Sequence, residues 1–460
     1  MRKLGVVRAI TSDFEDSAMR LPPLVFVISL SCCTLLQAQD LRVNRFDDQL
    51  DGICDAHCSL RDAVSMHNQL GGTNRILLPS GIYNLSLPPE YGEEGEVYDE
   101  DQNLNGDLDV LLGSLVLVGA GRQVSIVDGG ALDRLLEVEA GATLTVQDLT
   151  LRNGFSSEDG GAIENRGQAV VRRSRLADNL LRYSWGGRHR GGAIFNAGTL
   201  EVYDSQFEGN RVDIGDSGGA FGGALFNAGT LTVRDTLFRA NRVNTDDVVG
   251  IGAALFNIGT ASMARVSVLE SQGDGEGVAV RNDGDGVLSL ANITVAKSQG
   301  QEYETDAAVA NGSYYPMYPG TPSMTLVHAS IADNQAVGLS NRGDLTVRNS
   351  LIIDNRLQNC LDDGSRYRAL GLLLGLDSGN CAADAYVANE QAYSLVLYAL
   401  SANGSGLPTF NLRPASPALD AAVGNCPTFD QRGFPRPRDG DGDGLAVCDL
   451  GAYERGAKNR

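Results

Sequence analysis

"GGAIFNAGTLEVYDSQFEGN" (residues 191–210) and "GGALFNAGTLTVRDTLFRAN" (222–241) are nearly the same string, placed one after the other in the chain. In both copies, apolar and polar residues alternate after the first asparagine, as at Leu200 and Val202. A period of two is that of a β-strand and not of a helix. Each strand is short and ends at Gly or Asn, so one copy cannot bury its apolar side alone. The copies are therefore expected to stack on one another.

Further copies of the string begin at residues 160, 252, 277 and 338. Their alignment produces two columns of asparagine. The first column holds Asn165, Asn196, Asn227, Asn257, Asn282 and Asn341, and the second holds Asn179, Asn210, Asn241 and Asn355. Ser271 and Ser298 replace the second asparagine in two copies, and Asn334 belongs to a further copy. Extra residues always follow the second asparagine, so the insertions are confined to one bend.

Stacked short strands separated by bends predict an all-β solenoid, a parallel β-helix, over residues 76–358. Successive turns of this fold, here called rungs, lie about 4.8 Å apart, so that equivalent residues stand directly above one another. Asparagine tolerates a left-handed bend and hydrogen-bonds to the copies above and below, which gives both columns a structural role. A β-sandwich or a propeller is the alternative, but the aligned asparagines and the confined insertions favour the solenoid.

An open solenoid needs covered ends, since its terminal rungs present unpaired strand edges. Residues 39–75 fit an N-terminal cap with one short helix, in which Ser59 is the N-cap and Asp62 completes a capping box. Leu60, Ala63, Val64 and His67 then share one helix face. Residues 359–460 are expected to form a disulfide-bearing C-terminal cap.

Residues 1–38 are expected to be an export signal, because "LPPLVFVISLSCCTLLQA" (21–38) is an apolar run that follows Arg20. Met19 is an alternative start, and Cys33 is an alternative lipid acceptor. No later segment is apolar enough to span a membrane. Removal of the signal leaves Cys54, Cys58, Cys360, Cys381, Cys426 and Cys448. An even count in an exported chain favours disulfides, and zinc binding is the competing interpretation. Fifteen connectivities are possible, and the one that joins sequence neighbours is predicted: Cys54–Cys58, Cys360–Cys381 and Cys426–Cys448.

The 460-residue chain carries a formal charge of −21, which excludes nucleic acid as a partner because nucleic-acid binding needs a basic surface. A long anionic polysaccharide would be repelled by the whole chain, although a local basic groove would escape this. Lysine occurs only at positions 3, 297 and 458, so few candidates exist for a lysine base.

Three stretches carry family resemblances. "CDAHCSLRDAV" (54–64) resembles the signature of CSLREA-domain proteins, with Asp62 in place of the usual glutamate. Residues 413–454 resemble the choice-of-anchor Q domain, and the central repeats resemble those of polymorphic outer-membrane proteins. These resemblances imply a right-handed parallel β-helix, similar to the pectin-lyase-like fold, that is secreted or displayed on a bacterial surface. They do not imply a defined catalytic site.

Two acidic loops suggest calcium, because alternating oxygen ligands around a glycine resemble an EF-hand loop. A solvated turn is the alternative for each, since Leu112 and Leu450 occupy the place of the bidentate glutamate. No other cofactor is predicted. The first loop offers Asp101, Asn103, Asn105, Asp107 and Asp109, and the second offers Asp439, Asp441 and Asp443.

The favoured function is a non-catalytic adhesin or glycan-binding scaffold, monomeric, with an extracellular glycan or a cell-surface protein as partner. Trp185, Arg188, His189 and Arg190 are its candidate ligand-binding residues, with a solvated loop tip as the alternative. A polysaccharide lyase or glycosidase is the competing function. It would need carboxylates that face one cleft, but the acidic residues are scattered through bends, at Asp204, Asp235, Asp246, Asp247, Asp362 and Asp363.

Overall fold

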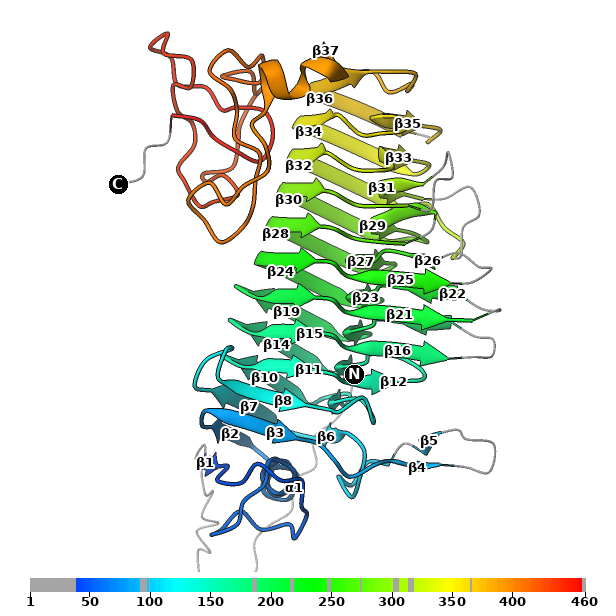
Figure 1. The fold of residues 1–460 in the computed structure, drawn as a ribbon, viewed down its shortest axis with the longest axis vertical. Coiled ribbons are helices and arrows are strands. Elements are labelled where there is room, and N and C mark those ends of the chain that lie inside the picture. The colour runs from blue at the N-terminus through cyan, green and yellow to red at the C-terminus, as the bar shows by residue number, and fades with distance from the viewer. Residues whose placement is uncertain are drawn as a thin grey trace, which may run out of the picture. The chain divides into compact units, whose positions relative to one another are not determined.

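The computed structural model describes residues 39–91, 97–98, 100–183, 188–215, 219–245, 250–273, 275–300, 306–312, 318–364 and 366–456. Its strands pair in parallel from rung to rung, apart from one small antiparallel pair, β4 (Glu90–Tyr91) with β5 (Val97–Tyr98). The rungs stack along the long axis in Figure 1. The predicted all-β parallel β-helix is therefore confirmed.

The larger sheet has 18 strands. Its main strands are β1 (Gln39–Arg42), β2 (Thr73–Leu78), β7 (Ser114–Gly119), β10 (Thr143–Gln147), β14 (Gln168–Arg172), β19 (Thr199–Tyr203), β24 (Thr230–Arg239), β28 (Thr260–Leu269), β30 (Val287–Ala296), β32 (Ser323–Ala332), β34 (Asp344–Ile353) and β36 (Arg366–Leu376). Shorter strands that follow a bend are β3 (Gly81–Asn84), β8 (Ser125–Asp128), β11 (Thr150–Arg152), β15 (Arg175–Ala177), β20 (Gln206–Glu208) and β37 (Ala385–Ala388). From β24 to β36 a single strand runs through that bend.

The second sheet has ten strands, contributed by successive rungs. They are β6 (Leu108–Val110), β9 (Leu136–Val138), β13 (Ile163–Asn165), β18 (Ile194–Asn196), β23 (Leu225–Asn227), β27 (Leu255–Asn257), β29 (Glu276–Asn282), β31 (Ala307–Asn311), β33 (Val337–Asn341) and β35 (Cys360–Asp362). Parallel pairing continues beyond residue 358, through β36 to β37.

Alternation along each strand fills the core between the two sheets. Leu200 pairs in register with Leu231, and Val202 with Val233, and all four side chains are buried. One continuous apolar cluster extends from the first rungs to β36. Burial of successive leucine and valine side chains removes apolar surface from water on every rung, which is the main force that holds the stack together.

Both asparagine columns lie buried along the solenoid. In the first column each side-chain Nδ2 donates to the Oδ1 of the next asparagine, as from Asn196 to Asn227 at 2.6 Å. This ladder runs through Asn165, Asn196, Asn227, Asn257, Asn282, Asn311 and Asn341 and ends on the Asp362 carboxylate. The second column runs from Asn179 through Asn210 to Asn241, and resumes from Asn334 through Asn355 to Asn359 and the Asp377 carboxylate.

The N-terminal cap contains the predicted helix, α1 (Leu60–Leu70). Ser59 caps it and the Asp62 carboxylate accepts from the Ser59 backbone N–H, which confirms the capping box. His67 is buried on the covered face, and its Nε2 lies 3.0 Å from the Leu112 carbonyl oxygen. All three disulfides join sequence neighbours: Cys54–Cys58, Cys360–Cys381 and Cys426–Cys448.

The insertions after the second asparagine form two further small sheets, here called the insertion flap. One sheet contains β12 (Phe155–Ser156), β16 (Leu180–Tyr183), β21 (Arg211–Ile214) and β25 (Arg242–Thr245), and the other contains β17 (Arg188–Arg190), β22 (Gly219–Phe221) and β26 (Gly250–Ile251). The flap extends to one side of the solenoid (Figure 1). It covers a small aromatic core of Phe195, Phe226 and Phe256, whose rings stack from rung to rung.

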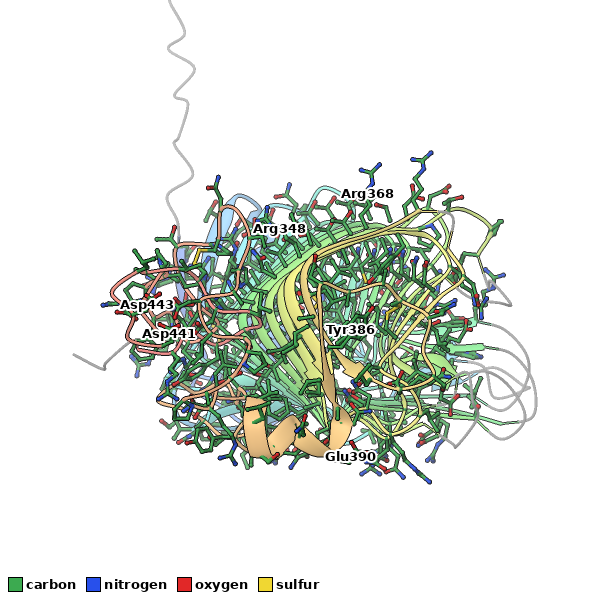
Figure 2. The ribbon with its side chains drawn as sticks, turned by 90° about the horizontal axis from the view of Figure 1, so that it is seen from above. Arg348, Arg368, Tyr386, Glu390, Asp441 and Asp443 are labelled. Carbon is green, nitrogen blue, oxygen red and sulfur yellow. A yellow bond between two sulfur atoms is a disulfide. The ribbon has the colours of Figure 1, made fainter. Side chains whose placement is uncertain are left out.

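The C-terminal chain has two roles. A π-helix, η2 (Ala392–Val396), and the preceding 3-10 turn, η1 (Asn389–Gln391), follow β37 over the last rung. In the view onto this end, Tyr386 and Glu390 belong to the covering segment, while Asp441 and Asp443 lie to one side (Figure 2). Residues 397–456 pack against the side of the solenoid, where they share a second apolar core with the outer face of β28 to β36. No described helix is long and apolar enough to cross a membrane.

Candidate functional site

The loop at 429–432 fixes the C-terminal region to the solenoid. The Gln431 side chain reaches two rungs: its Nε2 donates to the Val266 carbonyl oxygen at 3.0 Å, and its Oε1 accepts from the Thr294 hydroxyl at 2.6 Å. Gln431 is itself buried. A fully paired buried amide of this kind defines one docking geometry, because any displacement leaves its polar atoms without partners.

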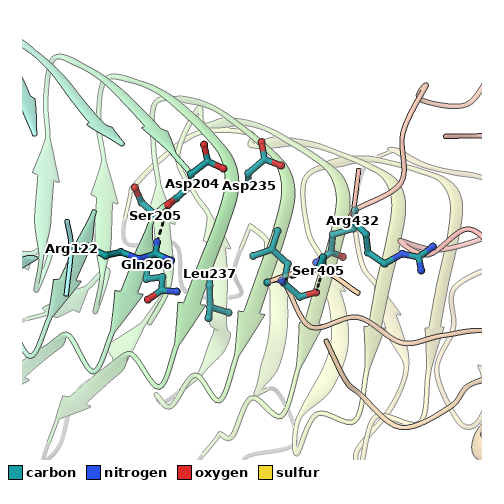
Figure 3. Close-up of a pocket in the computed structure, with 11 residues that line it drawn as sticks. Arg122, Asp204, Ser205, Gln206, Asp235, Leu237, Ser405 and Arg432 are labelled. Carbon is teal, nitrogen blue, oxygen red and sulfur yellow. Dashed lines mark hydrogen bonds between the residues drawn. The ribbon is translucent and has the colours of Figure 1, made fainter. Parts of the chain in front are cut away.

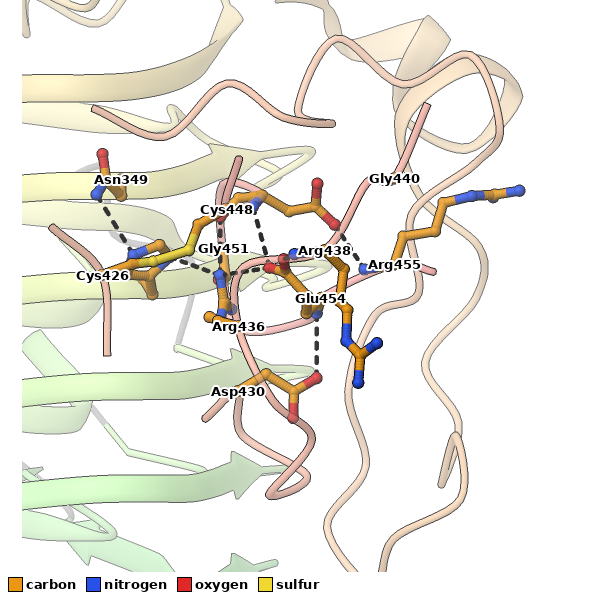
Figure 4. A network of polar contacts seen from close by, with 12 residues as sticks. Asn349, Cys426, Asp430, Arg436, Arg438, Gly440, Cys448, Gly451, Glu454 and Arg455 are labelled. Atoms are coloured by element: carbon orange, nitrogen blue, oxygen red, sulfur yellow. Dashed lines mark hydrogen bonds and ion pairs between the residues drawn. A yellow bond between two sulfur atoms is a disulfide. The ribbon is translucent and has the colours of Figure 1, made fainter. Parts of the chain in front are cut away.

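A buried polar network continues this contact (Figure 4). Arg436 donates to the Asp449 and Gly451 carbonyl oxygens, lies 2.9 Å from His328 Nδ1 on β32, and pairs with Glu454. Burial raises the pKa of the Glu454 carboxyl to about 7 and that of Asp449 to about 6. Burial and the Arg436 charge lower the pKa of His328 to about 3. These groups are enclosed by the C-terminal region, so their shifted pKa values belong to docking and not to a substrate site.

A polar pocket opens between the solenoid and the edge of the docked C-terminal region (Figure 3). We call it the ledge pocket. Its volume is about 270 Å³, which is room for a single sugar ring. The solenoid contributes Arg122, Asp204, Ser205, Gln206, Asp235 and Leu237, and the C-terminal region contributes Ser405, Gly406, Leu407, Gln431 and Arg432.

Two charged side chains of the ledge pocket, Asp235 and Arg122, already have hydrogen-bond partners. Both oxygens of Asp235 accept from Arg265 at 2.6 Å, and the Arg122 guanidinium donates to the Asp204 carbonyl oxygen at 3.1 Å. The Asp204 side chain is exposed and lies one rung before Asp235. Amide, hydroxyl and carboxylate groups around a small apolar floor are the usual composition of a site that binds a polyhydroxylated ligand.

The predicted ligand-binding stretch at 185–190 lies partly outside the described residues, since Trp185 is not described. Arg188 stands over the ring of Tyr318 at 4.5 Å, and His189 is buried. Arg190 pairs with Asp159, whose carboxyl pKa is raised by burial, and stacks over Phe195 at 4.4 Å. Arg188, which is exposed, and Arg190, which is half-buried, thus each stand over an aromatic ring, and both the ligand-binding interpretation and the loop-tip alternative remain predictions.

The first acidic loop encloses an arginine. The Arg61 guanidinium, paired with Asp48, donates to the carbonyl oxygens of Asn105, Gly106 and Asp107. The Asn103 side chain turns back on the Asp109 backbone, whereas Asp101 is exposed. The loop carbonyls thus converge on a guanidinium that the sequence pattern alone does not place there.

Two carboxylates of that loop, Asp107 and Asp109, lie instead beside the buried Glu137, with oxygens within 4.8 Å of one another. Arg134 pairs with Asp107 at 3.1 Å and with Glu137, so a positive charge is already present in this group. The second loop brings Asp439 and Asp441 within the same distance of Asp420. Asp443 accepts from the Leu445 backbone N–H. Asp420 precedes the loop by 19 residues, so local spacing does not reveal it.

One more pair of carboxylates stands out on the solenoid. Asp333 and Asp354 occupy equivalent bends of neighbouring rungs, and the Asp333 N–H donates to the Asp354 carbonyl oxygen. Burial raises the pKa of both carboxyls, and the Asp333 charge raises that of Asp354 further. Lys297 occupies the same bend one rung earlier. Unlike Glu454, both carboxylates are only half-buried.

No protein-family model matches the chain, and no curated protein sequence matches it. Among solved structures, pectate lyase Pel9A is similar at 14% identity and a TM-score of 0.40, over 91% of this chain and 96% of the other. The A-module of the Azotobacter vinelandii mannuronan C-5 epimerase AlgE4 is similar at 17% identity and 0.36, over 73% and 88%. The catalytic unit of a GH87 α-1,3-glucanase from Streptomyces thermodiastaticus follows at 15% and 0.20, over 71% and 66%.

Proposed function

We propose that the protein is an exported, non-catalytic β-helix scaffold that binds an extracellular glycan, as an adhesin does. The ledge pocket carries the proposal, because it is the described cavity to which both the solenoid and the C-terminal region contribute polar side chains. A pocket of this size suits one sugar ring of a longer chain, which leaves the rest of the glycan to lie along the outer face of the rungs.

The rigidity of the scaffold supports a binding function. The buried amide ladders and the docked Gln431 hold both walls of the ledge pocket in one geometry, so little ordering entropy is lost when a ligand binds. The buried groups with shifted pKa values, Glu454 and His328, belong to the network that holds the C-terminal region in place.

The family assignments and the location belong to the same proposal. On the strength of the quoted sequence motifs, residues 39–75 are a CSLREA-type cap and residues 413–454 a choice-of-anchor Q-type region. An exported protein with an even number of cysteines and three disulfides fits an oxidising compartment, and the bacterial outer surface is the location that this resemblance favours.

Glycan binding is tested with the purified chain and a panel of plant, algal and bacterial polysaccharides, with and without calcium. Binding without release of unsaturated or reducing-end products is expected. A Gln206→Ala variant should weaken binding, because Gln206 lines the ledge pocket, whereas Asn244→Ala on the exposed edge of the flap should not. Release of cleavage products would overturn the non-catalytic function.

Polysaccharide cleavage is the second candidate, and the Asp333–Asp354 pair favours it. Two half-buried carboxyls on equivalent bends of adjacent rungs, both with raised pKa values, offer the two groups that a glycosidase needs as acid and base. If products appear in the panel, Asp354→Asn should abolish them and leave glycan binding intact. Activity that survives both Asp333→Asn and Asp354→Asn would exclude this pair.

A further inference from the structure

Next to the ledge pocket, three large side chains stand in register on the outer face of the larger sheet. Arg172 on β14 pairs with Tyr203 on β19, and Tyr203 pairs with Arg234 on β24. The preceding residues, Val171, Val202 and Val233, are buried in the core, so by strand alternation these three project outward. We call Arg172, Tyr203 and Arg234 the arginine–tyrosine patch.

The two arginines of the patch lack the partners that their neighbours have. Arg173 is paired with Asp148, and Arg265 with Asp235. Within the part of the chain that the structure describes, neither Arg172 nor Arg234 forms an ion pair, and the buried Nε of Arg172 has no acceptor. Both guanidinium groups therefore remain available to an anionic ligand, in a chain whose net charge is −21.

The local charge around the patch is positive. The unpaired guanidiniums of Arg172 and Arg234 are joined by Arg122 at the pocket edge, whereas the facing carboxylates are Glu201 and Asp204. Glu201 is also engaged, since it accepts a hydrogen bond of 3.0 Å from the Tyr203 hydroxyl. With the neighbouring Arg265–Asp235 pair included, four guanidiniums face three carboxylates, which leaves a basic spot on an otherwise acidic surface.

From this arrangement we infer that the glycan is acidic, and that Arg172 and Arg234 bind its carboxylate groups on either side of a sugar ring that packs on Tyr203. A guanidinium binds a carboxylate through two parallel hydrogen bonds, and an aromatic ring packs against the apolar face of a pyranose. Rungs about 4.8 Å apart repeat these contacts along the solenoid axis, so the polysaccharide would run from rung to rung toward the ledge pocket. This inference rests on the proposed glycan-binding function and names its ligand class.

The test compares one uronic-acid oligosaccharide, oligogalacturonate, with the same oligosaccharide after carboxyl reduction, by calorimetry on the full chain. The acidic form should bind at least tenfold more tightly. Arg172→Gln and Arg234→Gln should each weaken binding of the acidic form about tenfold, which is the loss of one charge-assisted contact, and leave the reduced form unchanged. Tyr203→Ala should weaken binding of both forms, and Tyr203→Phe should weaken neither.

Arg366→Gln combined with Arg368→Gln is the matched control, because it removes two exposed charges from the same sheet at the last rung. It should leave the affinity unchanged. Equal binding of both forms, unaffected by the patch variants, would overturn this inference and leave glycan binding standing. Binding of neither form would overturn both. Equal affinity for single-stranded DNA would reduce the patch to a general polyanion surface and would likewise overturn the inference.

Discussion

Asn196 lies in the middle of the first amide ladder and offers the sharpest test of the fold. Its Nδ2 donates to Asn227 Oδ1 at 2.6 Å and to the Thr230 carbonyl oxygen at 3.1 Å, and its Oδ1 accepts from Asn165. All three asparagines are fully buried. Asn196→Ala removes these contacts from a region that water cannot reach.

The cost follows from the groups that are left behind. Asn227 Oδ1 loses its donor, and Asn165 Nδ2 keeps only the bond to the Thr199 carbonyl oxygen. The unsatisfied Asn227 acceptor costs about 1–3 kcal/mol, and the two other lost bonds, from Asn165 and to Thr230, add about 1 kcal/mol each. A total loss of about 3–5 kcal/mol in the free energy of unfolding is therefore expected.

Denaturant unfolding would measure this loss, and hydrogen exchange would place it on β18, β23 and their neighbours, since repeat proteins lose stability locally. Asn244→Ala, an asparagine on an exposed strand of the flap, should change stability by less than about 0.5 kcal/mol. If Asn196→Ala unfolded like the parent chain and lost only glycan binding, the column would be a ligand site and the structural reasoning would be refuted.

Further predictions concern the flap, the docking network, the second acidic loop and the C-terminal contact. Arg190→Ala should destabilise the chain by about 1–2 kcal/mol in denaturant unfolding, because a half-buried ion pair and a cation–π contact are lost. An unchanged unfolding midpoint would favour the interpretation as a solvated loop. Glu454 has a raised folded pKa, so the folded state binds more protons between about pH 4.5 and 7, and this group's contribution to stability falls as pH rises through that window. The free energy of unfolding of the parent chain, measured relative to that of Glu454→Gln, should therefore fall by about 1–3 kcal/mol between pH 5 and pH 7.5. A difference between the two proteins that does not change with pH would contradict the assigned cause. If the loop at 439–443 binds calcium, EDTA should lower the melting temperature of the parent and leave Asp441→Asn unaffected; equal curves would support a solvated turn. Asn292→Asp should release the C-terminal region to limited proteolysis, because a buried carboxylate would replace the amide that donates to the Phe429 carbonyl oxygen; a protease-resistant variant would contradict this.

The strand repeats and the capped helix can be predicted from residues that are close together in the sequence. Alternation at Leu200 and Val202 predicts which side chains enter the core, and the short spacing from Ser59 to Asp62 predicts the capping box. Both are decided by residues a few positions apart, so the sequence contains the whole interaction. Asn311 is missing from the predicted column because its copy, "DAAVAN" (306–311), has no glycine ahead of the asparagine, although it occupies the same place in the ladder.

Contacts between distant segments were not predictable in this way. The ledge pocket joins Gln206 to Ser405 and Gln431, which are about 200 positions apart in the chain, and Arg61 enters a loop more than 40 positions away. The sequence does contain a signal that the C-terminal region covers one side of the solenoid. Outward positions that are polar in early rungs, such as Glu208, become apolar at Leu269 and later rungs. An apolar residue on the outer face of a solenoid predicts that something covers it.

The bend that joins the two halves of the larger sheet explains why the pocket lies where it does. Each rung places one residue there in the left-handed conformation, in the order Asp148, Arg173, Asp204, Asp235, Arg265, Asn292, His328 and Asn349. The first five are charged and only partly buried or exposed, and the last three are uncharged in the folded protein and buried against residues 423–436. Because desolvation of a charge is costly even in an ion pair, and desolvation of a hydrogen-bonded neutral group costs much less, the C-terminal region covers the neutral bends and stops before Arg265. The ledge pocket forms at that boundary, where charged bends remain accessible beside a fixed wall. The proposed binding site and the docking surface are thus separated by one change of residue class, from charged to neutral, along a single column of the solenoid.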